Sequence, residues 1–173
     1  MMLDAVIVLV ARFAIGWLFV AGGVGKLKDV AEFERSLAAY RIVPQSLERA
    51  SAWSLAVVEL AIGLGSLAQQ PLALLAAGAL LAVYAAAIAI NLVRGRRFID
   101  CGCGGAAQPL SGGIVARNIA LLAVVAIAVA EPSARPLAWV DAVSVVAGVL
   151  VCATIYAAVN QLLAARAQLE EWI

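Results

Sequence analysis

Five long apolar segments constrain the fold of this 173-residue chain more than any other feature of its sequence. They extend over about residues 3–24, 47–67, 71–93, 114–130 and 136–165. A bilayer core is about 30 Å thick, and a helix needs about 20 mostly apolar residues to cross it. Only 13% of the residues are charged, whereas about a quarter are charged in a soluble domain. The sequence therefore predicts an all-α membrane protein with five transmembrane helices.

The connections between the apolar segments predict one compact bundle. The second and third segments are joined by "AQQP" and the fourth and fifth by "EPSARP", so each pair should be antiparallel neighbours. Pro71 and Pro136 suit the first turn of a helix, where the missing N–H has no partner to lose. The N-terminal segment has no basic region before its apolar run, which favours a retained span over a cleaved signal peptide. Residues 1–173 are thus predicted to form a single transmembrane domain.

A charged segment at about residues 29–43 predicts a short amphipathic helix on the membrane surface. Apolar residues recur at helical spacing through "KDVAEFERSLAAYRIVP", with charged residues between them. Asp29 and Glu32 stand in capping-box register, and Pro44 closes the segment. The alternative is a solvated charged linker.

Lysine and arginine placement predicts the orientation, because cytoplasmic loops carry an excess of these residues. With the N-terminus outside, the outer side holds only Arg135. The inner side then holds Lys26, Lys28, Arg35, Arg41, Arg49, Arg94, Arg96, Arg97, Arg117 and Arg166. We therefore expect the C-terminus in the cytoplasm. The net charge of +1 gives no support for a nucleic-acid partner, and none is expected.

Two charges fall inside the predicted spans, Arg12 in the first and Glu59 in the second. A charge alone in the bilayer centre costs about 2.5–3.5 kcal/mol on an insertion scale. Because these spans run in opposite directions, we predict that Arg12 and Glu59 form a buried ion pair. Such a pair either fixes helix register or lines a cavity or proton path.

A second polar set gathers at the inner end of the predicted bundle. It consists of Lys26, Asn91, Arg117 and Asn118. We expect these residues to ring the loop that follows the third span. For Arg117 the alternative is that its side chain extends to lipid phosphates.

Cys101 and Cys103, separated by Gly102, are the predicted reactive site. They lie in "FIDCGCGGAAQPLSGG", whose glycines forbid a continued helix and permit positive φ. Two residues this close can join in a small, strained disulfide, and a strained disulfide is the better oxidant. Nearby cations such as Arg97 favour the reactive thiolate, whereas Asp100 opposes it.

Other uses of the cysteines remain open at this stage. Thiolates also bind soft metals such as Cu(I), and two inert reduced cysteines are the plainest alternative. A closed zinc site needs four ligands, and the chain offers three cysteines and no histidine. Cys152 is expected to be a small buried hydrophobe, with a resolving or ligand role as the alternative.

Four stretches together resemble the MauE family, which is named for methylamine utilisation and is related to DoxX-like membrane proteins. They are "ARFAIGWLFVAGGVGKLKD", "VVELAIGLGSL", "RGRRFIDCGCGG" and "GIVARNIALL". The family usually has an aromatic residue where this chain has Gly105. The resemblance implies a DoxX-like four-helix bundle plus a fifth span in a bacterial plasma membrane.

The resemblance also implies a redox function. It makes Cys101 and Cys103 the redox pair, and Arg12, Glu59 and Arg117 an intramembrane polar network. It implies support for disulfide handling in exported proteins with a thioredoxin-like partner, either MauD-like or a cytoplasmic thioredoxin. With the thiols at the inner end, electrons would pass through a cavity or a membrane quinone, or they would come from a cytoplasmic thioredoxin and be relayed outward.

Rival functions are a soft-metal or small-molecule transporter and a non-catalytic scaffold. The residues leave open whether the protein is an enzyme. The alanine- and glycine-rich spans suit a tight monomer or a homodimer.

Overall fold

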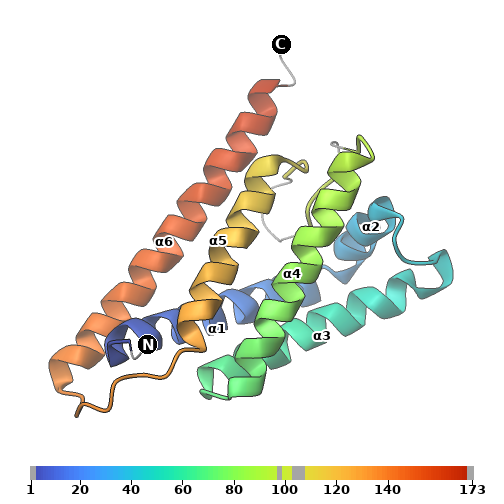
Figure 1. Ribbon diagram of the computed structural model, residues 1–173. Coiled ribbons are helices and arrows are strands. Elements are labelled where there is room, and N and C mark those ends of the chain that lie inside the picture. The colour runs from blue at the N-terminus through green and yellow to red at the C-terminus, as the bar shows by residue number, and fades with distance from the viewer. Residues whose placement is uncertain (1–2, 97–98, 103–107, 171–173) are drawn as a thin grey trace.

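The computed structural model describes residues 3–96, 99–102 and 108–170, which form a bundle of α-helices (Figure 1). The helices are α1 (Ala5–Lys28), α2 (Val30–Tyr40), α3 (Glu48–Leu67), α4 (Pro71–Val93), α5 (Gly112–Ala128) and α6 (Trp139–Glu170). A short 3-10 turn, Gln45–Leu47, leads into α3. Four apolar stretches are long enough to cross a membrane: Ala5–Lys28, Gln45–Leu67, Pro71–Val93 and Trp139–Arg166. The prediction of an all-α, multi-pass membrane protein is confirmed.

The fifth predicted span, α5, is apolar but only 17 residues long. At 1.5 Å per residue it rises about 26 Å, slightly less than a bilayer core of about 30 Å. Its crossing of the membrane stays a prediction, as does the assignment of the whole chain to one domain. α6 begins at Trp139, so Pro136 lies in the connection before the helix and not in its first turn.

Helices α1 and α3 run side by side because glycines let their backbones approach closely. A Cβ atom added at Gly63 would lie 2.6 Å from the backbone nitrogen of Val20. One added at Gly23 would lie 2.8 Å from the backbone nitrogen of Leu60. These contacts fix the antiparallel register of the two helices.

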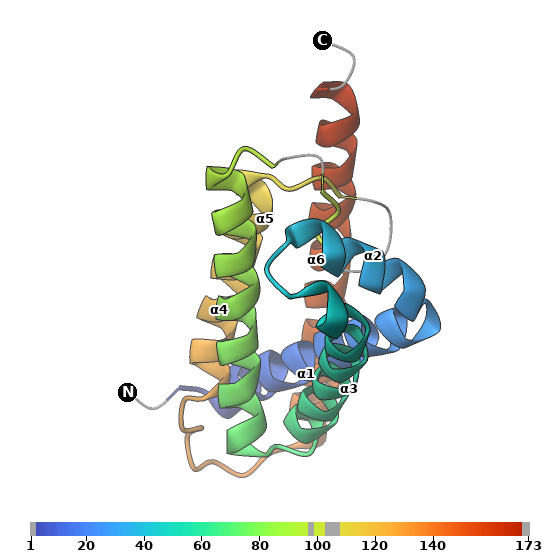
Figure 2. The same cartoon turned by 90° about the vertical axis from the view of Figure 1, so that its right-hand side faces the viewer.

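The remaining long helices pack around this pair (Figure 2). α4 lies against α5, and a buried cluster of Ile15, Phe19, Ile62, Ala77, Leu81 and Val125 joins both to α1 and α3. α6 packs on α1, where the Val10 side chain fills the space over Gly148. The Leu163 side chain of α6 also packs against Gly113 at the start of α5.

Arg12 lies at the end of the bundle that holds the N-terminus and the two short connections. Its Nε donates to the carbonyl of Ala128 at 2.8 Å, and its Nη2 donates to that of Ala130 at 3.3 Å. Its Nη1 donates to Gln69 Oε1 at 3.2 Å. The guanidinium therefore satisfies carbonyl groups at the C-terminal end of α5, which a helix leaves without partners of its own.

The predicted ion pair between Arg12 and Glu59 is therefore wrong. Gly16 packs against Leu67 and Gly23 against Leu60, so the register sets Arg12 level with the end of α3. Glu59 is level with the opposite end of α1, where a different cation meets it.

The predicted amphipathic helix is confirmed, although it ends at Tyr40 and not near residue 43. The Asp29 side chain accepts a hydrogen bond from the Glu32 backbone N–H at 2.9 Å, as the capping register predicts. Phe33, Ser36 and Tyr40 are buried against the bundle. α2 thus covers one end of the bundle, beside the loop that carries Cys101; its position at a membrane surface stays a prediction.

Candidate functional site

The described parts of the cysteine loop pair with each other. The Cys101 backbone N–H donates to the carbonyl of Gln108 at 2.9 Å, and that of Leu110 donates to the carbonyl of Ile99 at 3.1 Å. Gly102 has φ +66°, in the left-handed region that favours glycine, as the glycine-rich composition predicted. Its N–H donates to the Asp100 side chain at 3.0 Å. The loop therefore turns sharply just after Cys101.

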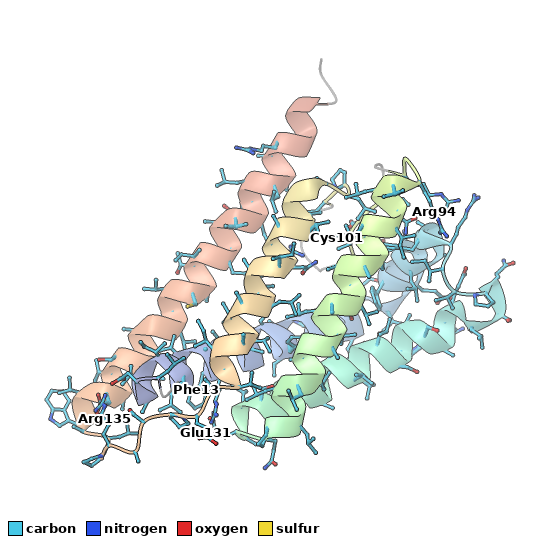
Figure 3. The ribbon with its side chains drawn as sticks, viewed as in Figure 1. Phe13, Arg94, Cys101, Glu131 and Arg135 are labelled. Carbon is cyan, nitrogen blue, oxygen red and sulfur yellow. The ribbon has the colours of Figure 1, made fainter. Side chains whose placement is uncertain are left out.

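Two predicted site residues, Arg97 and Cys103, lie outside the described residues. The predicted pairing of Cys101 with Cys103 is thus a sequence prediction only. Figure 3 shows Cys101 toward one end of the bundle and Glu131 and Arg135 toward the other.

Cys101 is held from two sides. The Tyr40 hydroxyl, on α2, donates to the Cys101 carbonyl at 3.1 Å. The Cys101 thiol donates to Gln108 Oε1 with a sulfur–oxygen distance of 3.8 Å. Both Tyr40 and Gln108 are buried. Tyr40 therefore holds the backbone at Cys101, while Gln108, in the returning part of the same loop, orients the thiol.

Arg117 connects this thiol to α6. Its Nη1 donates to Asn160 Oδ1 at 2.6 Å and to Gln108 Oε1 at 3.4 Å, while Gln108 Nε2 donates to the Asn160 carbonyl at 2.9 Å. The Arg117 guanidinium also lies 5.6 Å from the centre of the Tyr156 ring. With 8% of its surface exposed, Arg117 is a buried member of the site and does not extend to lipid phosphates.

The cation that meets Glu59 is Lys26. Lys26 Nζ lies 2.8 Å from Glu59 Oε2, and the side chains are only 6% and 4% exposed. The Tyr84 hydroxyl on α4 donates to the other carboxylate oxygen. Lys26 also lies 5.1 Å from the centre of the Phe33 ring, a cation–π distance. Gly22 leaves room for the carboxylate, because a Cβ atom there would come within 3.2 Å of Glu59 Oε2.

A small cavity of about 60 Å³, here called the inner cavity, joins these two polar groups. Lys26, Glu59 and Tyr84 line one side, and Arg117, Asn118 and Tyr156 line the other. A water molecule needs about 10–15 Å³ of such volume and two to four polar partners, and both conditions are met here. The Lys26–Glu59 ion pair and the hydrogen-bonded side chains around Arg117 therefore line the same polar cavity.

A larger cavity of about 180 Å³, here called the thiol cavity, lies on the other side of Lys26. Cys101 and Gly102 form part of its wall, together with Tyr40 and Tyr84. Lys26 and Tyr84 line both cavities and therefore lie between the thiol and the buried carboxylate. The structure brings together Cys101, Gly102, Lys26, Glu59, Arg117 and Asn118.

Two other predicted site residues do not join this group in the way expected. The Asn91 side chain is buried and donates to the Ala87 carbonyl of its own helix at 3.0 Å. Cys152 is exposed on α6, so its predicted burial is wrong. It lines a separate cavity of about 260 Å³ between α1, α5 and α6 and does not border the thiol cavity. The cause is that α6 packs on the bundle along one side only.

Sequence reasoning missed Tyr40, Tyr84, Gln108 and Asn160. Tyr84 and Asn160 carried a usable signal, since each is a polar side chain inside a long apolar run. Gln108 carried none, because a glutamine in a glycine-rich loop is ordinary.

These features define a multi-pass helical membrane protein with a thiol loop and a buried polar network at one end of its bundle. The family model described as methylamine utilisation protein MauE matches residues 4–131. The chain belongs to this family. α6, which supplies Asn160 and Tyr156, lies beyond the matched residues.

Curated relatives agree with this assignment. A methylamine utilization protein MauE from Paracoccus denitrificans is 45% identical over 131 residues, which cover 72% of this chain and 70% of that protein. The protein of the same name from Paracoccus versutus is 37% identical over 124 residues, covering 69% and 67%. That from Methylophilus methylotrophus is 32% identical over 102 residues, covering 58% and 54%. No solved structure matches the chain significantly.

Proposed function

We propose that this protein is an accessory of methylamine utilisation in a bacterial plasma membrane, and that it acts by thiol–disulfide exchange at Cys101 and Cys103. Its partner is a thioredoxin-like protein, and the exchange serves the redox maturation of exported proteins. The observation that carries the proposal is the setting of Cys101, a thiol oriented by Gln108 in a wall shared with the buried Lys26.

The exchange reaction balances without a further reactant. A thiolate of a reduced partner attacks the Cys101–Cys103 disulfide and forms a mixed disulfide. The second partner thiol then resolves it, so that the partner leaves oxidised and both loop cysteines are thiols. Arg117, which shares the Gln108 side chain with the thiol, favours the thiolate of Cys101, because positive charge stabilises the anionic form. The positive φ of Gly102 gives the turn that a Cys-Gly-Cys ring needs.

Differential alkylation tests this proposal. Purified protein is oxidised mildly, alkylated, reduced and alkylated again with a second reagent, and each cysteine is read by mass spectrometry. Cys101 and Cys103 should both switch to the second label, while Cys152 keeps the first. A Cys152→Ser variant is the control and should switch the same two residues. If Cys101 and Cys103 take the first label throughout, the exchange function is refuted.

Mixed-disulfide trapping identifies the partner class. A Cys103→Ser variant should accumulate a reducible adduct with a thioredoxin-like protein, and a Cys101→Ser/Cys103→Ser variant should not. A non-catalytic scaffold predicts instead that the double variant keeps full function in cells.

The proposed orientation places the thiol loop toward the cytoplasm and the N-terminus outside. Its support is that Lys26, near the end of α1, lines the thiol cavity with Cys101, and that Arg94, just after α4, lies at the same end of the bundle, while Arg135 lies at the other end (Figure 3). A membrane-impermeant maleimide should therefore label Cys101 and Cys103 in inverted vesicles and not in intact spheroplasts. Labelling in spheroplasts alone would reverse the orientation.

A further inference from the structure

The thiol cavity is formed by parts of the chain that are distant in sequence. Phe33 and Tyr40 come from α2, Leu55 from α3 and Tyr84 from α4, and the loop adds Cys101. Its walls are almost entirely apolar or aromatic, and Lys26 is its buried cation. A mostly apolar hollow with a few convergent polar groups is the usual form of a small-molecule site.

The size of the cavity suits one six-membered ring. Its volume is about 180 Å³, and an engineered apolar cavity of about 150 Å³ is known to hold benzene. The aromatic side chains of Phe33 and Tyr84 offer faces or edges against which a flat ring can pack.

The polar group in the wall is the Lys26 ammonium, and it favours a ligand with a neutral hydrogen-bond acceptor. A lysine ammonium has three N–H donors. Within the described residues, its one hydrogen-bond acceptor is Glu59, so donors remain on the cavity side. Because Glu59 already neutralises the charge of Lys26, an anionic head group would meet no net positive charge. A carbonyl oxygen fits this site better than a carboxylate or phosphate.

The exposed part of the cavity wall is apolar, as a surface in contact with lipid would be. Ile42 and Val83 line the cavity and are 48% and 59% exposed, although both are apolar. α3 and α4 meet at a tight turn and diverge toward α2 (Figures 1 and 2), and Leu55 of α3 and Val83 of α4 both line the cavity. Both helices are long and apolar enough to span a bilayer. A ligand would therefore enter sideways from the membrane and leave its tail there.

We propose that the thiol cavity binds the ring of an isoprenoid quinone, with a ring carbonyl accepting a hydrogen bond from Lys26 beside Cys101. The inference deepens the proposed function, because the quinone is the oxidant that restores the disulfide. The Cys101 and Cys103 thiols give up two electrons and two protons and form one S–S bond. The quinone takes up both electrons and both protons and leaves as the hydroquinone.

Binding is tested apart from the redox reaction. Full-length protein in lipid nanodiscs is titrated with decylubiquinone, and bound quinone is measured by equilibrium dialysis. Ala87→Phe fills the thiol cavity and should weaken binding by more than about tenfold. Ala153→Phe, the same change in the cavity that Cys152 lines, is the matched control and should leave affinity within about twofold. Equal affinity of Ala87→Phe and wild type would refute the site.

The role of the lysine is tested with a variant that keeps the interior uncharged. Lys26→Met/Glu59→Gln removes both charges together and should weaken quinone binding by about tenfold or more, as expected for a lost hydrogen bond to a charged donor. Unchanged affinity in this folded variant would refute Lys26 as the donor.

The electron transfer has its own readout. Reduced protein mixed with decylubiquinone should form one hydroquinone for each two thiols lost, and Cys101→Ser should bind quinone without reducing it. Binding without any thiol loss in wild type overturns the oxidant role. Partner trapping without quinone binding leaves the exchange function standing and refutes this inference. Quinone binding with cysteines that never pair leaves the binding site standing but refutes both the exchange function and the oxidant role of the quinone.

Discussion

Removing one partner of the Lys26–Glu59 ion pair should destabilise the protein far more than removing both. The two charges lie 2.8 Å apart, with their side chains 6% and 4% exposed. At an effective dielectric constant of about 20, their attraction is about 6 kcal/mol. The cost of taking two ions out of water is several kcal/mol for each, so the intact pair contributes little net stability. A single buried charge has no such compensation, and its cost is about 3–5 kcal/mol.

A double-mutant cycle measures this difference. Glu59→Gln and Lys26→Met should each lower the free energy of unfolding by about 3–5 kcal/mol, and the double variant should lower it by less than either. Tyr84→Phe removes one hydrogen bond to the carboxylate and should cost about 1–2 kcal/mol. Unfolding is followed by helical circular dichroism as the mole fraction of sodium dodecyl sulfate rises in mixed micelles.

Lys28→Met is the matched control for the cycle. Lys28 lies on the same helix, two residues further on, and is exposed, so its replacement should change stability by less than about 0.5 kcal/mol. If the two single costs simply add in the double variant, Lys26 and Glu59 are not coupled. The reasoning from their distance and burial would then be refuted.

Three further changes probe the packing and the opposite end of the bundle. Gly63→Ala should cost about 1–3 kcal/mol, because the new Cβ would lie 2.6 Å from a backbone nitrogen of α1. Gly25→Ala, with nothing within 4 Å, should not lower the melting temperature, because alanine has the higher helix propensity. Arg12→Met should cost about 1–3 kcal/mol and speed hydrogen exchange at the C-terminal end of α5, because two carbonyls lose their donor. Unchanged exchange there would contradict the hydrogen bonds from Arg12. The hydrogen bond from Arg135 lowers the pKa of Asp4 below its ordinary 3.8, so its contribution to stability is complete above about pH 4 and is lost as the pH falls through the lowered pKa. Asp4→Asn should remove that part of the acid sensitivity in a melting series from pH 6 to about pH 2.5. If the pH profiles of Asp4→Asn and wild type coincide, the Asp4–Arg135 contact makes no such contribution.

The helices and the loop could be predicted because their signals are local. A run of apolar residues is sufficient to specify a membrane helix, since each residue contributes to insertion nearly independently of distant parts of the chain. Asp29 caps α2 through a contact three residues away. Gly102 takes a positive φ, as the glycine-rich composition of that stretch predicted.

The partners of the buried charges could not be predicted in the same way. Arg12 and Glu59 both fall inside predicted spans, but α1 continues to Lys28 and brings a second cation, Lys26, level with Glu59. The sequence contains both cations and does not say which one the carboxylate meets. Gln108 likewise joins the site only because its loop returns alongside Cys101.

By itself, the sequence determined that the chain is a multi-pass helical membrane protein, that a short amphipathic helix follows the first span, and that Gly102 next to Cys101 allows a sharp turn. Those properties depend on hydrophobicity and backbone freedom over a few consecutive residues. Only the tertiary structure decided that Lys26 pairs with Glu59, that Arg12 binds the end of α5, and that Cys152 lies apart from Cys101. The physical reason is helix register, which the close contacts at Gly16, Gly23 and Gly63 set. Along a helix each residue adds about 1.5 Å and turns the side chain by about 100°, so a shift of two or three residues would exchange every buried partner.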